Sequence, residues 1–316
     1  MILKKLAAAA VLAAMGSVTT ASPQYINPKP LSDLKVSYGA FTDRNTVSVP
    51  VITWPADMKT IHANGDQSRT GKGSLFDKMG LDIEIQRADG FDVQLKNFVS
   101  GKTPYLRGTL GMIAASQELL EANGIKPVVI YQMSWSAGGD SVVVKNHIKS
   151  LSDLKGKTIA LQAYGPHVDY LAKVLKDAGV PLSSVNLKWV KDLTGTENSP
   201  AEALFDKDVD AVFVITPDAL ALTSGGKVGT GAEGSVKGAR VALDTGSANR
   251  IISDVYAVRS DYLKARGGDV EKFVTALMQA DEQVVETMKT KGNGYQSMVR
   301  GSAKILFDSE QASGEV

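Results

Sequence analysis

The chain has 316 residues, 35 Lys and Arg against 34 Asp and Glu, and no cysteine. Such a balanced charge argues against nucleic-acid binding and against electrostatic attachment to a membrane. The absence of cysteine excludes disulfides, thiolate metal sites and Cys nucleophiles. We also expect no lipid anchor, because a lipoprotein signal needs a Cys at its cleavage point.

The first residues have the pattern of a secretory signal. Lys4 and Lys5 precede an apolar run at 6–15, and a stretch of small residues ends near Ala21. The run is shorter than the ~20 residues of a membrane span. A short buried helix is the alternative, which the flanking lysines disfavour. We therefore predict a signal peptide at 1–21, cleaved near Ala21. The mature chain, with 33 basic and 34 acidic residues after Lys4 and Lys5 are removed, is expected in the periplasm.

After this segment, short runs that are β-branched, or that alternate apolar and polar residues, are followed in turn by longer amphipathic stretches. In the first half we predict strands at 47–53, 81–86 and 126–132, helices at 92–105 and 116–124, and a buried strand or strand end at 109–114. The helix at 116–124 begins at Ser116 and is followed by Gly124, and both are common at helix ends.

A second series of elements begins after residue 149. We predict strands at 157–162, 185–190 and 209–215, helices at 150–156, 167–178, 199–205 and 269–291, and a Gly-rich loop at 224–238. Strands that alternate with helices are typical of a parallel α/β sheet. Because the series runs twice, we predict two lobes with ligand in the crevice between them. The expected crossings lie at 142–145 and 244–258. They give a first lobe of 22–143 plus 245–316 and a second lobe of 144–244.

Three segments carry a resemblance to a known family: ITWPAD at 52–57, SAGGDSVVVK at 136–145 and SLSDLKGKTIA at 150–160. They resemble the substrate-binding proteins of ABC importers, in the nitrate, sulfonate and taurine branch that also contains binders of thiamine-pyrimidine precursors. The resemblance implies an α/β, type II periplasmic-binding-protein fold, in which each lobe is a mixed, mostly parallel sheet flanked by helices. Members of this branch often run longer, so we expect part of the first lobe's helical cover to be missing.

Motifs of enzymes and metal sites are weak in this sequence. No G-x-S-x-G elbow accompanies the three histidines, as an α/β hydrolase would require. An S-x-x-K match at 152–155 is explained by a capped short helix. A G-x-G-x-x-G match at 229–234 has no strand close before it and is interpreted as a surface loop. His62 with Asp57 or Asp66 fits no metal-ligand spacing. We therefore predict no enzyme activity, no cofactor and no metal.

Candidate ligand-binding residues follow the strands, at the carboxyl edge of each sheet. Trp54 either stacks on a flat or cationic ligand or fills the core of its own lobe. Gly138 and Gly139 either allow close approach to a ligand or form the turn that enters the hinge. Asp218 either contacts ligand or caps the following helix. The candidate set is Trp54, Met112, Ser136, Gly138, Gly139, Gln162, Tyr164, Gly165, His167, Thr216 and Asp218.

The turn at 162–169 is the predicted main contact of the second lobe. Its free amides, at the start of a helix, suit a carboxylate, a sulfonate or another electron-rich group. Gln162 and Tyr164 offer directional hydrogen bonds, and His167 offers a proton-dependent one. The alternative is a simple strand-to-helix turn in which these side chains only pack.

We therefore predict a monomeric periplasmic solute-binding protein. It would capture a small organic or oxyanion solute, such as a sulfonate, taurine, nitrate or a pyrimidine-like compound, and deliver it to an ABC permease in the inner membrane. Closure follows because contacts from both lobes exist together only in the closed state. One alternative is an enzyme on the same fold, related to intracellular pyrimidine-precursor synthases, which the export signal and the absent cysteine disfavour. The other alternative is a ligand-sensing module, and the sequence does not distinguish a sensor from a component of an importer.

Overall fold

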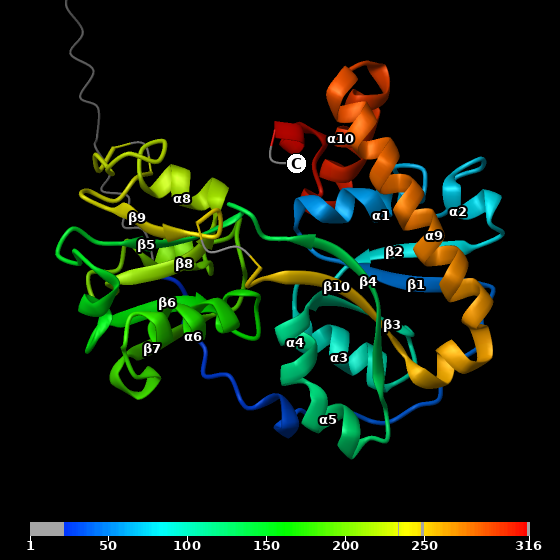
Figure 1. The fold of residues 1–316 in the computed structure, drawn as a ribbon, viewed down its shortest axis with the longest axis horizontal. Coiled ribbons are helices and arrows are strands. Elements are labelled where there is room, and N and C mark those ends of the chain that lie inside the picture. Colours follow the sequence, from blue (N-terminus) through cyan, green and yellow to red (C-terminus); the bar gives the residue numbers. More distant parts are fainter. Residues whose placement is uncertain (1–21, 233, 248–249, 315–316) are drawn as a thin grey trace, which may run out of the picture.

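The computed structural model describes residues 22–232, 234–247 and 250–314, so the predicted signal peptide lies outside the described residues. Two α/β bodies lie side by side and are joined by long strands that cross between them (Figure 1). The body on the right is named the first lobe and the body on the left the second lobe. Strands and helices alternate in both, which confirms the α/β class that the sequence predicts.

The first lobe takes its strands from both halves of the chain: β1 (Thr46–Val51), β2 (Asp82–Arg87), β3 (Tyr105–Thr109), β4 (Pro127–Trp135) and β10 (Ser253–Arg259). β1 and β2 pair in parallel, whereas β10 lies between β3 and β4 and runs antiparallel to both. The hydroxyl of Thr103 donates to the carbonyl of Ser48 at 2.7 Å, which ties the segment before β3 to β1.

The second lobe has one five-stranded sheet made of β5 (Asp140–Val144), β6 (Thr158–Gln162), β7 (Asn186–Val190), β8 (Ala211–Ile215) and β9 (Arg240–Asp244). The strand order is β7-β6-β8-β5-β9. β6 pairs in parallel with β7 and β8, and β5 runs antiparallel to β8 and β9. β5 and β8 are buried along their whole length, as expected for strands covered on both faces.

Helices cover both sheets. The first lobe carries η1 (Leu31–Asp33), η2 (Pro55–Asp57), α1 (Met58–Ala63), α2 (Leu75–Lys78), α3 (Phe91–Val99), α4 (Leu110–Ala115), α5 (Gln117–Ala122), α9 (Ser260–Thr290), α10 (Asn293–Phe307) and η5 (Glu310–Gly314). The second carries η3 (Leu151–Leu154), α6 (His167–Asp177), η4 (Leu182–Ser184), α7 (Pro200–Ala203) and α8 (Thr216–Leu222). Among the described helices, none combines the length and the apolarity that crossing a membrane would require.

Each lobe has its own hydrophobic core. In the first lobe, the ring of Phe273 on α9 lies 4.7 Å from that of Tyr105 and 5.3 Å from that of Tyr256. In the second lobe, Tyr170 on α6 meets Phe213 on β8 edge to face at 5.3 Å. Separate cores allow the lobes to behave as bodies that move relative to one another.

A fully buried ion network holds the carboxyl edge of the first sheet. Arg107 on β3 donates to the Asp57 carboxylate at 2.7 Å and to the Asp254 carboxylate at 2.9 Å. Burial raises the pKa of Asp57 to about 6, against the opposing effect of Arg107. Because Asp57 follows β1 and Asp254 lies in β10, the arginine fixes three strands beside the point where the chain returns from the second lobe.

The two crossings between lobes lie against each other. The first runs through residues 136–139, and the second leaves β9 at Asp244 and enters β10 at Ser253. The amide of Ser136 donates to the carbonyl of Ile252 at 2.9 Å. The hydroxyl of Thr245 accepts from the amides of residues 138 and 140, at 3.0 and 3.1 Å. These bonds join the two crossings into one two-stranded hinge.

Two predicted elements in the first lobe are wrong. The helix predicted at 92–105 ends at Val99, because Gly101 has a φ of 75° and a buried strand follows. The strand predicted at 109–114 is instead the helix α4. Thr109 begins it by accepting a hydrogen bond from the amide three residues later, so the apolar residues that follow continue as a helix.

The predicted crossing at 142–145 is displaced, whereas the predicted region 244–258 contains the second crossing, which runs from Asp244 to Ser253. Val142 pairs with Phe213 and Leu243 inside the second sheet, so β5 belongs wholly to that sheet. The predicted division of the chain into 22–143 plus 245–316 and 144–244 stays a prediction, and its first boundary falls inside β5.

Candidate functional site

The turns at the carboxyl ends of the strands meet between the two lobes. Those after β1 and β3 come from the first lobe, and those after β6 and β8 come from the second. Two cavities lie where they meet. We name them the hinge-side cavity, which touches the first crossing, and the strap-side cavity, which touches the N-terminal segment.

The hinge-side cavity has a volume of about 90 Å³ and is closed by Trp54 of the first lobe. The indole lies across the cleft against Gly139, where an added Cβ would stand 2.5 Å from the ring. Thr216 of the second lobe and the end of α10, Leu306 and Phe307, complete the wall. Trp54 therefore lies in the cleft, where the fit between lobes depends on a glycine opposite it.

The strap-side cavity is larger, about 320 Å³, and has mostly apolar walls from both lobes. α4 contributes Gly111, Met112 and Ala115. The turn after β6 and the start of α6 face it, with Trp189 at the end of β7. The second-lobe lining residues are Tyr164, Gly165, Val168, Asp169 and Trp189. The cavity thus exists only while the two lobes lie together.

Residues 28–31 form the third wall of this cavity. They belong to the N-terminal strap, defined here as residues 22–34. The strap begins on the second lobe, where the amide of Ile26 donates to the carbonyl of Trp189 at 2.8 Å. The hydroxyl of Tyr25 donates to Asp206 at 3.0 Å.

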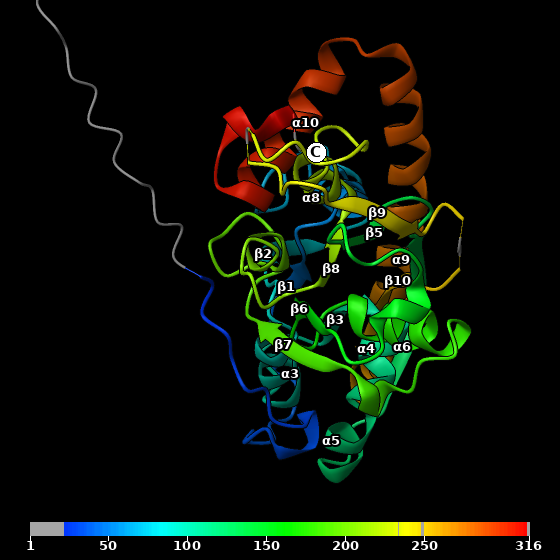
Figure 2. The same cartoon turned by 90° about the vertical axis from the view of Figure 1, so that its left-hand side faces the viewer.

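The strap then passes from the second lobe to the first, along the outside of the molecule (Figures 1 and 2). Leu31 is buried in a core cluster of the first lobe. Between these two anchors, the hydroxyl of Tyr164 donates to the carbonyl of Lys29 at 2.6 Å. The strap is therefore a third link between the lobes, beside the two crossings.

Carboxylates are prominent in the cleft. Asp89, after β2, accepts from the amide of Thr53 at 2.6 Å and from its hydroxyl at 3.1 Å. Burial is the main cause that raises the pKa of Asp89, and the charge of Asp192 on the second lobe adds to it. Burial also raises the pKa of Asp169 in the strap-side cavity.

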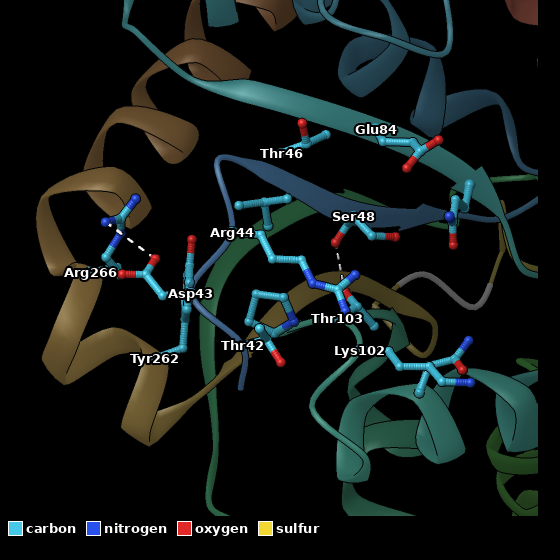
Figure 3. A pocket seen from close by; sticks show the side chains of 14 residues that line it. Thr42, Asp43, Arg44, Thr46, Ser48, Glu84, Lys102, Thr103, Tyr262 and Arg266 are labelled. Atoms are coloured by element: carbon cyan, nitrogen blue, oxygen red, sulfur yellow. Dashed lines mark hydrogen bonds and ion pairs between the residues drawn. The ribbon is translucent and has the colours of Figure 1, made fainter. Parts of the chain in front are cut away.

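Further cavities lie away from the cleft, and two of them are polar. The one in Figure 3, about 390 Å³, lies at the amino ends of β1 and β3 and is lined by charged side chains. Arg266 pairs with Asp43 at 3.4 Å, and Arg44 extends across the hollow. Another, about 940 Å³, lies between β2 and α10. Each is built from the first lobe alone, so lobe movement would not close either. In the part of the chain that the structure describes, no three His, Asp or Glu side chains form a metal-binding group.

Comparison with known families agrees with this architecture. The family model described as NMT1/THI5 like matches residues 72–287, more than half of the chain. The chain belongs to the NMT1/THI5-like family. Its family membership and its two lobes confirm the resemblance on which the sequence prediction rested.

Solved structures share the fold of this NMT1/THI5-like protein at low identity. The periplasmic aliphatic sulphonate-binding protein SsuA from Escherichia coli is 17% identical with a TM-score of 0.59, over 86% of this chain and 78% of that one. The periplasmic nitrate-binding protein NrtA from Synechocystis PCC 6803 is 14% identical with a TM-score of 0.62, over 84% and 67%. The desulfurization enzyme DSZB is 18% identical with a TM-score of 0.54, over 86% and 83%. These similarities show the periplasmic-binding-protein fold.

Six of the predicted site residues line the two cavities. Trp54, Gly139 and Thr216 line the hinge-side cavity, and Met112, Tyr164 and Gly165 line the strap-side cavity. Met112 is nevertheless mostly buried in the core of the first lobe.

The other five candidates make bonds inside the protein and line neither cavity. Ser136 and Gly138 both contact Thr245 at the hinge. Gln162 donates to the carbonyl of residue 191 at 3.3 Å. Asp218 accepts from the hydroxyl of residue 194 at 3.0 Å. His167 is fully buried and bonds to the carboxylate of residue 140.

His167, Asp140 and Ser136 form a chain whose order differs from that of a catalytic triad. His167 Nε2 lies 2.7 Å from one oxygen of Asp140, and the hydroxyl of Ser136 donates to the other. In a hydrolase the imidazole lies between the serine and the carboxylate, where it accepts the serine proton. Here the carboxylate lies in the middle. The chain instead connects the turn after β6 to the hinge.

Sequence reasoning missed several cavity residues, among them Asp169, Trp189 and the strap. Trp189 lies inside a correctly predicted strand, whose alternation shows that one face is buried but not against what. Asp169 lies in the predicted turn, but its position one turn into a helix resembles an ordinary solvent-facing acid. The proline-containing strap has no periodicity that would indicate its contacts with both lobes.

Proposed function

We propose that this protein is the solute-binding component of an ABC importer, working in the periplasm as a monomer and passing its solute to an inner-membrane permease. The observation that carries the proposal is the strap-side cavity, whose walls come from both lobes. Its volume of about 320 Å³ lies within the ~300–1,000 Å³ of small-molecule sites. The descriptions of SsuA and NrtA as periplasmic binding proteins, and the predicted signal peptide, support the same role.

The proposed mechanism is capture by closure. A solute between α4 and the turn after β6 contacts both lobes only when they are together, so it binds the closed form more tightly and shifts the population toward it. Closure also brings Trp54 against Gly139 on the hinge side. The external surface of the closed form would then be what a permease recognises.

A thermal-unfolding screen of the chain without residues 1–21 tests the proposal. The solutes include alkanesulfonates, taurine, nitrate, pyrimidines and small amines. A specific solute at 100 to 1,000 times its dissociation constant adds about 3–4 kcal/mol to the free energy of unfolding. If no solute of any class stabilises the protein, solute binding itself is wrong.

A pair of variants on α4 locates the site. Ala114 and Ala115 are adjacent and exposed, but only Ala115 lines the strap-side cavity. We predict that Ala115→Trp fills the cavity and weakens binding of the identified solute by about tenfold or more, measured by titration calorimetry. The matched control Ala114→Trp should keep the wild-type affinity. Affinity within twofold for Ala115→Trp would place the solute elsewhere.

A further inference from the structure

The strap-side cavity contains a carboxylate that pairs with none of the described residues. Asp169 lies in the first turn of α6 and reaches across the cleft to α4. A Cβ built on Gly111 would stand 1.2 Å from its Oδ2, so the carboxylate lies against the glycine backbone of the other lobe. Among the described residues, no hydrogen bond or ion pair engages the Asp169 carboxylate, and burial alone accounts for its raised pKa.

The basic groups around the cleft do not neutralise this carboxylate. Lys29 lines the cavity from the strap, but it is an exposed residue. Lys96 on α3 pairs with Asp92 at 3.0 Å. Arg87, at the end of β2, divides its guanidinium between Asp89 at 3.5 Å and Asp308 at 2.8 Å. The nearby cations are therefore exposed or already paired.

The remaining walls favour an apolar or aromatic body for the occupant. Met112, Ala115, Val168 and the rings of Tyr164 and Trp189 supply most of the surface. The hydroxyl of Tyr164 already donates to the strap. Asp169 is an exposed residue at the open cavity, but the protein shields its carboxylate enough to raise its pKa. A carboxylate in that position, amid apolar walls, gains most from a ligand that brings its own positive charge, whereas a second anion there would be repelled.

We infer that the strap-side cavity takes a small, mainly apolar or aromatic solute with an ammonium, amidinium or similar cationic hydrogen-bond donor, which Asp169 receives. The inference rests on the proposed function and narrows its solute class. It separates this cavity from the oxyanion chemistry that the names of SsuA and NrtA indicate for those proteins. Gly111 has a part in this arrangement, because any side chain there would occupy the position of the carboxylate.

Probe pairs that share one carbon skeleton test the inference: benzylamine against phenylmethanesulfonate, and butylamine against butanesulfonate. Calorimetry on the chain without residues 1–21 should find that the ammonium member of each pair binds at least tenfold more tightly. Asp169→Asn should weaken the ammonium probe by about tenfold or more. The control Glu118→Gln removes the same charge from an exposed position on α5, outside the cavity, and should leave affinity within twofold. Affinity of the ammonium probe should also fall as the pH is lowered through the raised pKa of Asp169.

Three results would overturn the inference: tighter binding of the sulfonate members, equal loss in Asp169→Asn and Glu118→Gln, or no binding of either ammonium probe. If one of these results is accompanied by binding of a sulfonate or nitrate in the broad screen, the proposed solute-binding function is kept and only the cationic solute class is wrong. If the broad screen also finds no solute, the proposed function falls with it.

Discussion

At the scale of single residues, the two lobes meet where large side chains face glycines. Trp54 lies against Gly139, and Asp169 lies against Gly111. Gly139 does not have a positive φ, so its small size, and not its backbone freedom, is what the structure uses. A methyl group there would stand 2.5 Å from the Trp54 ring and 3.2 Å from the Ser136 hydroxyl.

We predict that Gly139→Ala hinders closure without unfolding either lobe. Solute affinity should fall about tenfold or more, while the free energy of unfolding of the solute-free protein changes by less than about 1 kcal/mol. Calorimetry and urea denaturation measure the two quantities. Trp54→Phe removes the ring edge that clashes, so the double variant should regain affinity relative to Gly139→Ala alone. Additive losses in this double-mutant cycle would contradict the proposed clash.

Position after a strand was a good guide to some cleft residues and a poor guide to others. Trp54, Tyr164 and Thr216 follow strands and do line the cavities, because the carboxyl ends of strands in both lobes face the cleft. His167 follows a strand as well, yet Asp140, 27 residues earlier in the chain, holds its ring inside the second lobe. Such a partner depends on how β5 packs beside α6, which local pattern does not encode.

At the scale of elements, some strands and helices follow from local sequence propensity, whereas others depend on their tertiary context. Buried strands such as β6 and β8 were predictable from their apolar, β-branched runs. β9 and β10 were missed, since their residues alternate weakly and follow a Gly-rich loop. α4 was taken for a strand because its apolar run is only one and a half turns long. A short apolar run fits either structure until its cap is known.

The strap has no sequence pattern that predicts its structure, yet it contacts both lobes. It bonds to the second lobe through Ile26 and to the first lobe through Leu31, and Tyr164 holds its middle. Prolines at 28 and 30 restrict its backbone, which lowers the entropy lost when it is held extended. Its attachment should therefore resist opening of the strap-side cavity.

We predict that Ile26→Pro releases the strap from the second lobe, because proline lacks the N–H that Ile26 donates to Trp189. Ile26→Ala keeps the N–H and is the matched control. Amide hydrogen exchange should be faster across residues 22–34 and in α4 for the proline variant than for the alanine variant. Equal exchange in the two variants would mean that the second lobe does not hold the strap.

At the scale of the whole molecule, two cores, two crossings and one strap define the motion available. The cores share no strand, so the lobes can rotate about the two crossings. Thr245 of the second crossing joins them by accepting hydrogen bonds from the backbone beside the first. The contacts of Trp54 with Gly139 and of Asp169 with Gly111 mark the described arrangement as a closed one. Opening would separate the walls of both cavities and expose them to water.

We predict that solute shortens the distance between the lobes. The chain has no native cysteine, so two introduced cysteines can be labelled without background. Val93 on α3 and Leu182 beside α6 are exposed and lie on different lobes. Spin labels at Val93→Cys and Leu182→Cys should report a broad distance distribution without solute and a shorter, narrower one with saturating solute. The control pair, Val93→Cys with Met278→Cys, lies within the first lobe and should not respond. An interlobe distance that solute leaves unchanged would mean that the cavity is preformed and rigid.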